Sequence, residues 1–359
     1  MTDTISEDAL PANAPRKSRA WLQRGLEVSI SLVCLWLALR GIDFGELWAA
    51  LAAARWIWVV PAILGITIMG LIKAWRWQIL FLPEHRVPFG AIFTAQSAGY
   101  LASNIFPGRV GELVRLVLLA SDQPVGGARV LSTMVVERLL DLLSLLAVLV
   151  ALLPFIQLPA WMMQSARILG IGALVATGFI VILSFWKSGV LIWAHRILGR
   201  VRFLDRPGLY ASIEHLIDGF AALRGRRGPA LILLSFAAWA AVIGESWAIR
   251  MAVQADVPLT GMVFAVVLTS LGMVAPSSPG YIGVFHFLVI EALRPFGVPE
   301  TTAMSIALIW HAVNYIMLSL TGMIMMWVHG TSIGQVVAKW RTRGEPAQQA
   351  DIKASKVTE

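Results

Sequence analysis

Two long apolar segments of the chain are interrupted at matching places by a Pro-Gly pair. The pairs are Pro107-Gly108 and Pro279-Gly280, 172 positions apart, and each segment opens next to a proline, Pro88 or Pro258. A Pro-Gly pair cannot continue a helix, because proline lacks the N–H group and glycine favours other backbone angles. The matching breaks predict a chain made of two similar halves, each with one broken apolar segment.

Composition places these segments in a membrane. The chain is 58% hydrophobic with a mean hydropathy of +0.74, which ordinary soluble domains do not show. Several apolar runs reach the roughly 20 residues that cross a bilayer as a helix. Irregular backbone at membrane depth is tolerated only where it is buried in protein or lines a polar cavity. We therefore expect the two Pro-Gly breaks to face each other near the membrane midplane, where broken helices form transporter binding sites.

The predicted fold is an all-α polytopic membrane protein with six full transmembrane helices and two re-entrant helical hairpins. The full spans are expected at about 25–40, 56–75, 130–153, 167–186, 229–250 and 301–328, and the hairpins at 89–119 and 259–293. Lys and Arg are frequent at both termini, at Lys73, Arg76 and Arg86, and in 187–228, but scarce in the loops 41–55 and 154–166. By the positive-inside rule, both termini are cytoplasmic. We interpret Arg76 as an interfacial residue that reaches toward lipid head groups.

This orientation makes the first hairpin enter from the cytoplasm and the second from outside, so the two halves form an inverted repeat. The segments are a cytoplasmic tail 1–21, a first half 22–153, an external loop 154–166, a second half 167–328 with an amphipathic cytoplasmic insert 187–228, and a cytoplasmic tail 329–359. The net charge of +8 is explained by orientation in an anionic membrane, and no nucleic-acid partner is expected. The single cysteine, Cys34, leaves no disulfide framework and no cysteine-based metal site, and we predict no metal or cofactor.

Charged residues lie where the hydrophobic pattern predicts lipid or protein interior. Each costs roughly 2.5–3.5 kcal/mol at a helix centre on insertion scales. The first hairpin and the span after it contain Arg109, Glu112, Arg115, Glu137, Arg138 and Asp141. One interpretation is structural, with pairs such as Arg109 with Asp141, Arg115 with Glu112 and Arg138 with Asp141. The other, which we favour, is that these side chains line the same cavity as the breaks.

The second half offers a nearly neutral set of polar residues. These are Ser277, Ser278 and Tyr281 at the break, and His311 and Asn314 on one face of the last span, while Glu245 lies 172 positions after Lys73. Ser278 is expected to cap the second half-helix, and Asn104 to serve the first one less directly. Helix N-termini and the Arg109 and Arg115 side chains suit a phosphate. The candidate proton carriers are Glu137, Asp141, Glu245 and His311.

Three motifs resemble the lysylphosphatidylglycerol synthase transmembrane family, the flippase-like membrane domain found in MprF proteins. They are Asn104-Ile-Phe-Pro-Gly-Arg-Val-Gly-Glu-Leu-Val-Arg115, Glu137-Arg-Leu-Leu-Asp141 and Pro276-Ser-Ser-Pro-Gly-Tyr-Ile-Gly283. The resemblance implies a bacterial inner-membrane protein that moves amphipathic lipids between leaflets. The substrate would be an anionic phospholipid, a hopanoid or a polyprenyl-linked lipid. The implied motif positions are Asn104, Pro107, Gly108, Arg109, Gly111, Glu112, Arg115, Glu137, Arg138, Asp141, Pro279, Gly280 and Gly283.

Two further classes of function stay open at this point. About 30 polar residues follow Val328, where aminoacyl-transferring relatives have a soluble catalytic domain, so lysyl transfer by this chain is not expected. No Walker motif or metalloprotease motif is present, and we predict a transporter rather than an enzyme. An intramembrane lipid transferase using Glu137 and Asp141 is one alternative. A scaffold that recruits a lipid-modifying enzyme through 187–228 is the other, and assembly into a homo-oligomer is left open.

Overall fold

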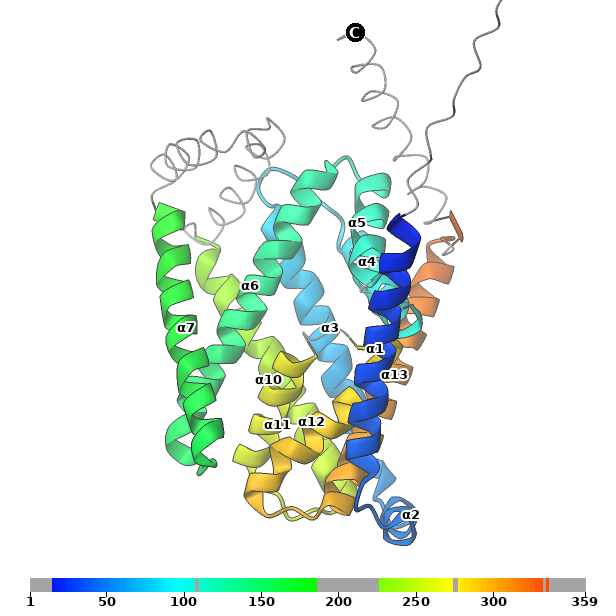
Figure 1. The fold of residues 1–359 in the computed structure, drawn as a ribbon. Coiled ribbons are helices and arrows are strands. Elements are labelled where there is room, and N and C mark those ends of the chain that lie inside the picture. The colour runs from blue at the N-terminus through cyan, green and yellow to red at the C-terminus, as the bar shows by residue number, and fades with distance from the viewer. Residues whose placement is uncertain (1–14, 107–109, 186–225, 274–276, 332–333, 336–359) are drawn as a thin grey trace, which may run out of the picture.

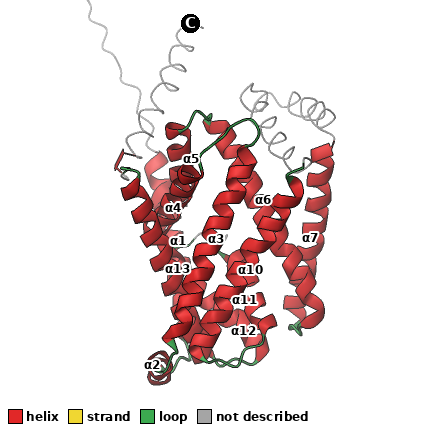
Figure 2. Ribbon diagram, turned by 180° about the vertical axis from the view of Figure 1, so that it is seen from behind, coloured by secondary structure: helices red, strands yellow, loops and turns green. Residues whose placement is uncertain are grey.

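The computed structural model describes residues 15–106, 110–185, 226–273, 277–331 and 334–335. Every regular element in these ranges is a helix, and they contain no strand (Figure 2). The predicted all-α class is therefore confirmed for this part of the chain. Residues 187–225 of the predicted amphipathic insert, and the Pro107, Gly108 and Arg109 of the first break, lie outside the described residues.

The long helices follow the predicted full spans. They are α1 (Pro15–Leu39), α3 (Val59–Phe81, after the 3₁₀ turn Trp56–Trp58), α6 (Gly127–Leu152), α7 (Ala160–Phe185), α10 (Gly228–Val253) and α13 (Glu300–Val328). Four segments, Trp56–Phe81, Gly127–Phe155, Gly228–Val253 and Glu300–Val328, are long and apolar enough to cross a bilayer. A fifth is added if α1 and α2 (Phe44–Ala52), bent by 85° at Gly41, count as one span. The chain is thus a membrane protein, and the count of six full spans stays a prediction.

The two interrupted segments form helix pairs, and the segment that connects the two helices of each pair contains the Pro-Gly motif. The first consists of α4 (Phe89–Ile105) and α5 (Val110–Asp122), and the second of α11 (Leu259–Gly272), the 3₁₀ turn η3 (Pro279–Tyr281) and α12 (Val284–Leu293). Within each pair the two helices pack against each other. Figure 1 shows α4 and α5 in the upper half of the molecule and α11 and α12 in the lower half. The hairpins therefore occupy opposite ends of the bundle.

Glycine allows the first hairpin to close. A Cβ atom placed on Gly111 would lie 2.1 Å from the Gly99 carbonyl oxygen and 2.1 Å from Ser103 Oγ. Only a residue without a side chain fits between the α4 and α5 backbones at this distance. Gly111 is thus a packing residue that fixes the direction of α5, and with it the side chains that α5 presents.

Contacts between the halves are reciprocal. Helix α3 packs against α10, α4 against α13, and α11 against α6, so each hairpin touches the last span of the opposite half. Helices α3 and α10 run antiparallel, since Arg76 bonds Ser235 while Gly65 faces Glu245. The turn η3 packs against α4, and a Cβ on Gly280 would lie 3.6 Å from the Asn104 carbonyl oxygen. The second break therefore meets the end of α4, just before the first one.

The apolar core is divided into two clusters. One gathers buried residues of α4, α5, the C-terminal half of α3 and the start of α6. The other joins α11, α12, α13 and α10 with the N-terminal half of α3 and the end of α6. Each hairpin has its own apolar cluster, and the polar side chains of α3, α6 and α10 lie where the clusters meet.

Several boundaries differ from the predicted ones. Residues 41–55 were expected to be a loop, but they contain α2, whose N-cap Asp43 accepts hydrogen bonds from the Gly45 and Glu46 amides at 2.8 and 3.0 Å. Helix α7 begins at Ala160, inside the predicted loop 154–166, and α1 begins at Pro15, inside the predicted tail. Helix α3 continues to Phe81 rather than ending near 75, which places Arg76 well inside a helix.

Candidate functional site

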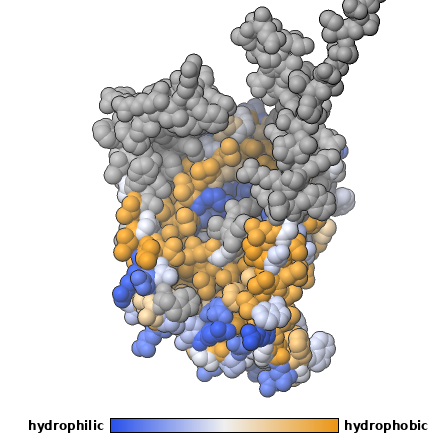
Figure 3. Space-filling model, viewed as in Figure 1, coloured by the Kyte–Doolittle hydropathy of each residue, from blue (hydrophilic) through white to orange (hydrophobic). Residues whose placement is uncertain are grey.

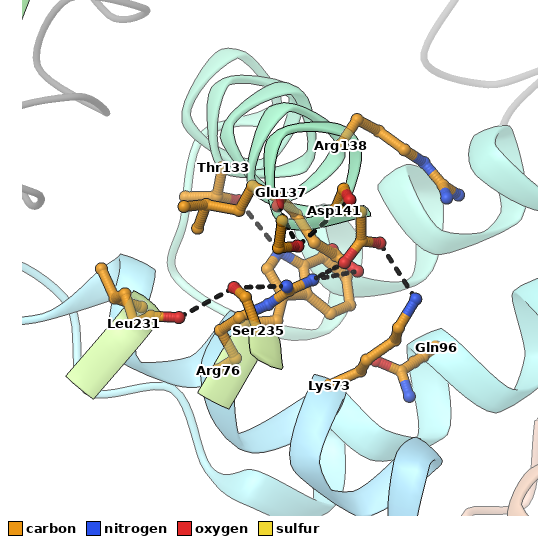
Figure 4. Close-up of polar contacts among 12 residues, drawn as sticks. Lys73, Arg76, Gln96, Thr133, Glu137, Arg138, Asp141, Leu231 and Ser235 are labelled. Carbon is orange, nitrogen blue, oxygen red and sulfur yellow. Dashed lines mark hydrogen bonds and ion pairs between the residues drawn. The ribbon is translucent and has the colours of Figure 1, made fainter. Parts of the chain in front are cut away.

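A buried ion network joins α3 to α6. Asp141 of α6 pairs through Oδ2 with Lys73 Nζ at 3.0 Å and through Oδ1 with Arg76 Nη2 at 2.7 Å. Lys73 and Arg76 are three residues apart on α3, so both reach the same carboxylate (Figure 4). Arg76 also donates to Ser235 Oγ of α10 at 2.8 Å. The network thus ties three helices together around one carboxylate.

The network continues to the first hairpin through Glu137, one turn before Asp141. Glu137 Oε2 lies 2.5 Å from Arg115 Nη2 of α5, and its Oε1 lies 3.9 Å from Arg76. The Arg115 guanidinium lies 4.1 Å from the centre of the Trp77 ring, a cation–π contact. Arg115 also approaches Glu112 at 3.6 Å, and Glu112 accepts a hydrogen bond from Arg138.

Burial changes along this chain of charges. Arg76 is 0% exposed and Glu137 1% exposed, whereas the Arg138 side chain is 55% exposed. Buried charges are stable only when they are paired, and the loss of one partner leaves the other uncompensated. Arg76, Arg115 and Glu137 therefore form the buried part of the network, while Arg138 is its most exposed cation among the described residues and the one most open to an incoming anion.

A cavity of about 390 Å³ lies against this network. Its charged side contains Lys73, Glu112, Arg138 and Asp141, and Tyr100, Ser103 and Asn104 of α4 add hydroxyl and amide groups. On the face seen in Figure 3, a hydrophilic area is set among apolar atoms. The remaining lining consists largely of apolar side chains of α3, α6, α10 and α11. A polar head group can be held here while its apolar part stays against hydrophobic surface.

The other side of the cavity is aromatic and nearly neutral. Glu245 of α10 accepts a hydrogen bond from Asn314 Nδ2 of α13 at 2.6 Å. The His311 ring lies 5.3 Å from Phe285 and 6.1 Å from Tyr315, measured between ring centres. Gly280, Tyr281, His311, Asn314 and Tyr315 all line the cavity. The second break and the last span of the second half thus meet the charged network across one space.

The start of α12 corrects the predicted role of Ser278. The side chain of Ser278 makes no capping bond to α12, whose N-cap is Gly283 at φ +87°. The chain between them adopts positive φ at Gly280 and Tyr281, so the helix starts five residues later than expected. The Ser278 amide instead donates to Ser31 Oγ of α1 at 2.7 Å. The Ser277 hydroxyl is buried and makes no hydrogen bond to the described residues.

The predicted site residues separate into two groups. The cavity is lined by Asn104, Glu112, Arg138, Asp141, Glu245, Gly280, Tyr281, His311 and Asn314, but not by Gly111, Arg115, Glu137, Ser277, Ser278, Pro279 or Gly283. Arg115 does approach Glu112, as expected for a structural pair, but its shorter contact is to Glu137. The predicted pairing of Arg138 with Asp141 is replaced by Arg138 with Glu112. No metal-binding group of His, Cys, Asp or Glu occurs in the described residues.

Sequence reasoning missed the α3 cations. Arg76 was interpreted as an interfacial residue, but it is fully buried and paired with Asp141, so that interpretation is wrong. Lys73, inside the predicted span 56–75, was used to set the orientation and was not predicted to pair with a carboxylate. The available signal was the spacing of two basic residues three apart inside an apolar run, opposite two carboxylates four apart in 130–153. Such spacings place each pair on one helix face.

Comparisons with known proteins agree with this description. A 258-residue stretch is 25% identical to glycosyltransferase AglD of Haloferax volcanii, covering 63% of this chain and 40% of AglD. A 229-residue stretch is 23% identical to the UPF0104 membrane protein MJ1078 of Methanocaldococcus jannaschii, covering 63% of this chain and 93% of that protein. The matched part of the chain thus spans less than half the length of AglD but nearly all of MJ1078.

A family model for the lysylphosphatidylglycerol synthase TM region matches residues 25–322. This range includes both hairpins, the ion network and every described residue of the cavity lining. The chain therefore belongs to the lysylphosphatidylglycerol synthase transmembrane family.

Proposed function

We propose that this protein is a lipid transporter that moves an anionic, phosphate-bearing lipid between the two leaflets. The head group would pass through the cavity while the acyl chains stay in the bilayer. The observation behind the proposal is a cavity of about 390 Å³ with one charged side, between two helix hairpins of a largely apolar bundle. Membership in the family agrees with a lipid-related role in the membrane.

The balance of charge at the site favours an anion. The network contains four cations and three carboxylates, namely Lys73, Arg76, Arg115 and Arg138 against Glu112, Glu137 and Asp141. Among the described residues this network, which does not include Glu245, therefore has one positive charge in excess, which matches a phosphate diester with one negative charge. Arg138 can turn from Glu112 to such a phosphate and hold it with two parallel hydrogen bonds. The neutral hydroxyl and amide groups of α4 would complete the contact.

We propose that the membrane arrangement is six full helices with two re-entrant hairpins in an inverted repeat. The reciprocal helix contacts and the opposite positions of the hairpins (Figure 1) support it. Alternating access would then consist of opening the cavity past one hairpin or the other. The proposed location is the bacterial inner membrane, with both termini in the cytoplasm.

A lipid-modifying activity is the competing proposal, because the relative AglD is named a glycosyltransferase. We propose that this chain moves its lipid unchanged. Glu137 and Asp141, the carboxylates that a transferase would need as base or nucleophile, are held by Arg115 and by Lys73 with Arg76. Mass spectrometry of the lipid after transport separates the two, since a transferase changes its mass and a transporter does not.

The test is lipid movement in proteoliposomes. Purified protein is reconstituted with labelled phosphatidylglycerol, polyprenyl phosphate or phosphatidylcholine, and the fraction of label exposed to an impermeant quencher is followed. We expect protein-dependent movement of an anionic lipid and slower movement of phosphatidylcholine. Arg138→Gln should slow the anionic lipid roughly tenfold or more, because hydrogen bonds to charged groups contribute about 1.5–3 kcal/mol.

The matched control is Arg294→Gln. Arg294 has the same side-chain exposure as Arg138, 56% against 55%, and also pairs with a glutamate, but it lies in a loop turn away from the cavity. Wild-type movement no faster than in protein-free vesicles, for all three lipids, would refute the proposal. Equal rates of anionic-lipid movement for Arg138→Gln and Arg294→Gln would show that Arg138 does not bind the phosphate. If the protein is instead a scaffold for a lipid-modifying enzyme, the wild type and both variants should show no protein-dependent movement of lipid.

A further inference from the structure

Glu245 is a buried carboxyl group that the phosphate site does not use. It is 0% exposed and lines the cavity through α10. Its Oε1 accepts a hydrogen bond from Asn314, while Oε2 makes no hydrogen bond to any described residue. Trp310, the other polar neighbour that interacts with it, is neutral like Asn314. No cation therefore compensates this carboxyl in the described part of the chain.

The corresponding position in the first half is different. Lys73 lies 172 positions before Glu245, and it joins α3 to α6 by an ion pair with Asp141. Glu245 joins α10 to α13, the helices that match α3 and α6, through an amide hydrogen bond from Asn314. The second span thus contacts the last span through an ion pair of Lys73 and Asp141 in the first half. In the second half the matching contact contains one ionisable group, Glu245, and the neutral amide of Asn314.

This difference distinguishes the candidate proton carriers. Asp141 is held by Lys73 and Arg76, and Glu137 by Arg115, and a nearby cation favours the ionised form of a carboxyl group. Glu245 has a free oxygen and no paired cation, and a buried ionised carboxylate without such a partner is costly. Of the three acids, Glu245 is the one that can gain and lose a proton without breaking an ion pair.

Groups on the neighbouring helices set the electrostatic surroundings of Glu245. Helix α11, Leu259–Gly272, contains no titratable residue. The titratable residues that face the cavity from the other elements are Lys73 of α3, Arg138 and Asp141 of α6, Glu112 of α5, Tyr100 of α4, Tyr281 of η3, and His311 and Tyr315 of α13. His286 of α12 adds a ring 4.8 Å from His311. The charged members of this set are already paired, so a charge that enters the cavity acts directly on Glu245.

We propose that Glu245 is a proton-binding site that couples the movement of one anionic lipid to the movement of one proton in the same direction. The inference rests on the proposed transport function. With Glu245 ionised, four carboxylates balance four cations among the described residues of the empty site. A bound lipid anion adds one negative charge, and protonation of Glu245 restores the balance. The cavity is therefore neutral when empty or fully loaded, and charged when it holds only the lipid or only the proton.

The sign of the coupling follows from repulsion between the lipid phosphate and the Glu245 carboxylate. Lys73 Nζ lies 5.1 Å from the Trp239 ring, and Trp239 precedes Glu245 by six residues, about 9 Å along the helix axis. A phosphate held on the charged side of the cavity, beside Lys73, would lie roughly 10 Å from Glu245. At an effective dielectric constant of about 20, two like charges at that separation change each other's binding constant by roughly tenfold. Lipid and proton should each strengthen the binding of the other to the same extent.

The test uses an imposed pH difference across proteoliposomes that contain labelled phosphatidylglycerol, a phosphate diester. The wild type should enrich the label in the leaflet facing the alkaline side, up to about tenfold per pH unit for one proton per lipid. Thermodynamic coupling makes this result independent of protein orientation. Glu245→Gln should abolish the enrichment. Glu300→Gln, an exposed glutamate paired with Arg294, is the matched control and should behave as wild type, and protein-free vesicles give the background.

Each outcome has one meaning. No wild-type movement without a gradient refutes the proposed function and, with it, the coupling. Movement that ignores the pH difference, or that follows a Na⁺ gradient at equal pH, overturns only the coupling. Enrichment that persists in Glu245→Gln removes Glu245 as the proton site.

A second measurement covers the case in which Glu245→Gln fails to move lipid at all. Infrared difference spectra, recorded with and without dispersed phosphatidylglycerol, should show a protonated-carboxyl band that appears in wild type on lipid binding. The band should be missing from Glu245→Gln and present in Glu300→Gln. Its absence from the wild type would overturn the inference.

Discussion

The burial of Arg76 gives the sharpest test of the ion network. Arg76→Met keeps an unbranched apolar side chain, shorter than that of arginine, and removes the charge. It breaks the 2.7 Å pair with Asp141 and the 2.8 Å hydrogen bond to Ser235. Breaking a buried pair costs about 3–5 kcal/mol. Because Asp141 keeps Lys73 at 3.0 Å, the loss should fall near the lower end, at about 3 kcal/mol.

Two further variants fix the scale. Asp141→Asn leaves both Lys73 and Arg76 without their carboxylate, so its loss should approach about 5 kcal/mol. Arg86→Met alters an exposed residue in the loop before α4 and should change stability by about 0.5 kcal/mol or less. The double variant Arg76→Met with Asp141→Asn should cost less than the sum of the two, since the residues share one pair.

The assay is SDS-induced unfolding of the purified protein in mixed micelles, followed by tryptophan fluorescence and circular dichroism. We expect the loss of unfolding free energy relative to the wild type to be largest for Asp141→Asn, smaller for Arg76→Met and smallest for Arg86→Met. An Arg76→Met protein as stable as Arg86→Met would refute the network, because it would mean that Arg76 reaches water or head groups. An additive double variant would show that Arg76 and Asp141 do not interact.

Two other predictions concern the hairpins. Gly111→Ala should weaken the α4–α5 pair, lowering thermal stability in detergent, whereas Gly244→Ala, which has open space beside it, should not; equal effects would contradict the tight contact. In a Cys34→Ala background, single cysteines replacing Glu84 and Asp256 should react with impermeant maleimide from opposite sides of the membrane, since they lie at the open ends of the two hairpins. Labelling of both from one side would contradict the inverted repeat.

The sequence predicted the features that depend on local backbone chemistry. Both Pro-Gly pairs lie in the segment that separates the two helices of a pair, Pro88 and Pro258 are the N-caps of α4 and α11, and the six long helices overlap their predicted ranges. Bilayer length and the missing N–H of proline act within one segment, so no partner helix is needed to infer them.

Contacts between distant segments were predicted less well. Asp141 could have paired with Arg109, Arg138, Lys73 or Arg76 on charge alone, and the choice depends on how α3, α6 and α10 cross. Ser278 was predicted as a cap because its residue type suits one, but Gly283 at φ +87° allows the chain to turn further before α12 begins. The extra turn brings Gly280 and Tyr281 into the cavity, where tertiary packing outweighs the local capping preference.

The antiparallel crossing of α3 and α10 has a consequence for the path of a head group. Ser235 of α10 lies at the same height in the bundle as Arg76 of α3, because the two side chains are hydrogen-bonded. Glu245 follows Ser235 by ten residues, which is about 15 Å along the axis of α10. That interval is half of the roughly 30 Å hydrocarbon layer. A lipid that crosses the membrane in one direction would meet the polar groups at the level of Arg76 first and Glu245 second, and a lipid that crosses in the other direction would meet them in the opposite order. In neither direction would the charged head group have to cross the whole hydrocarbon layer in one step.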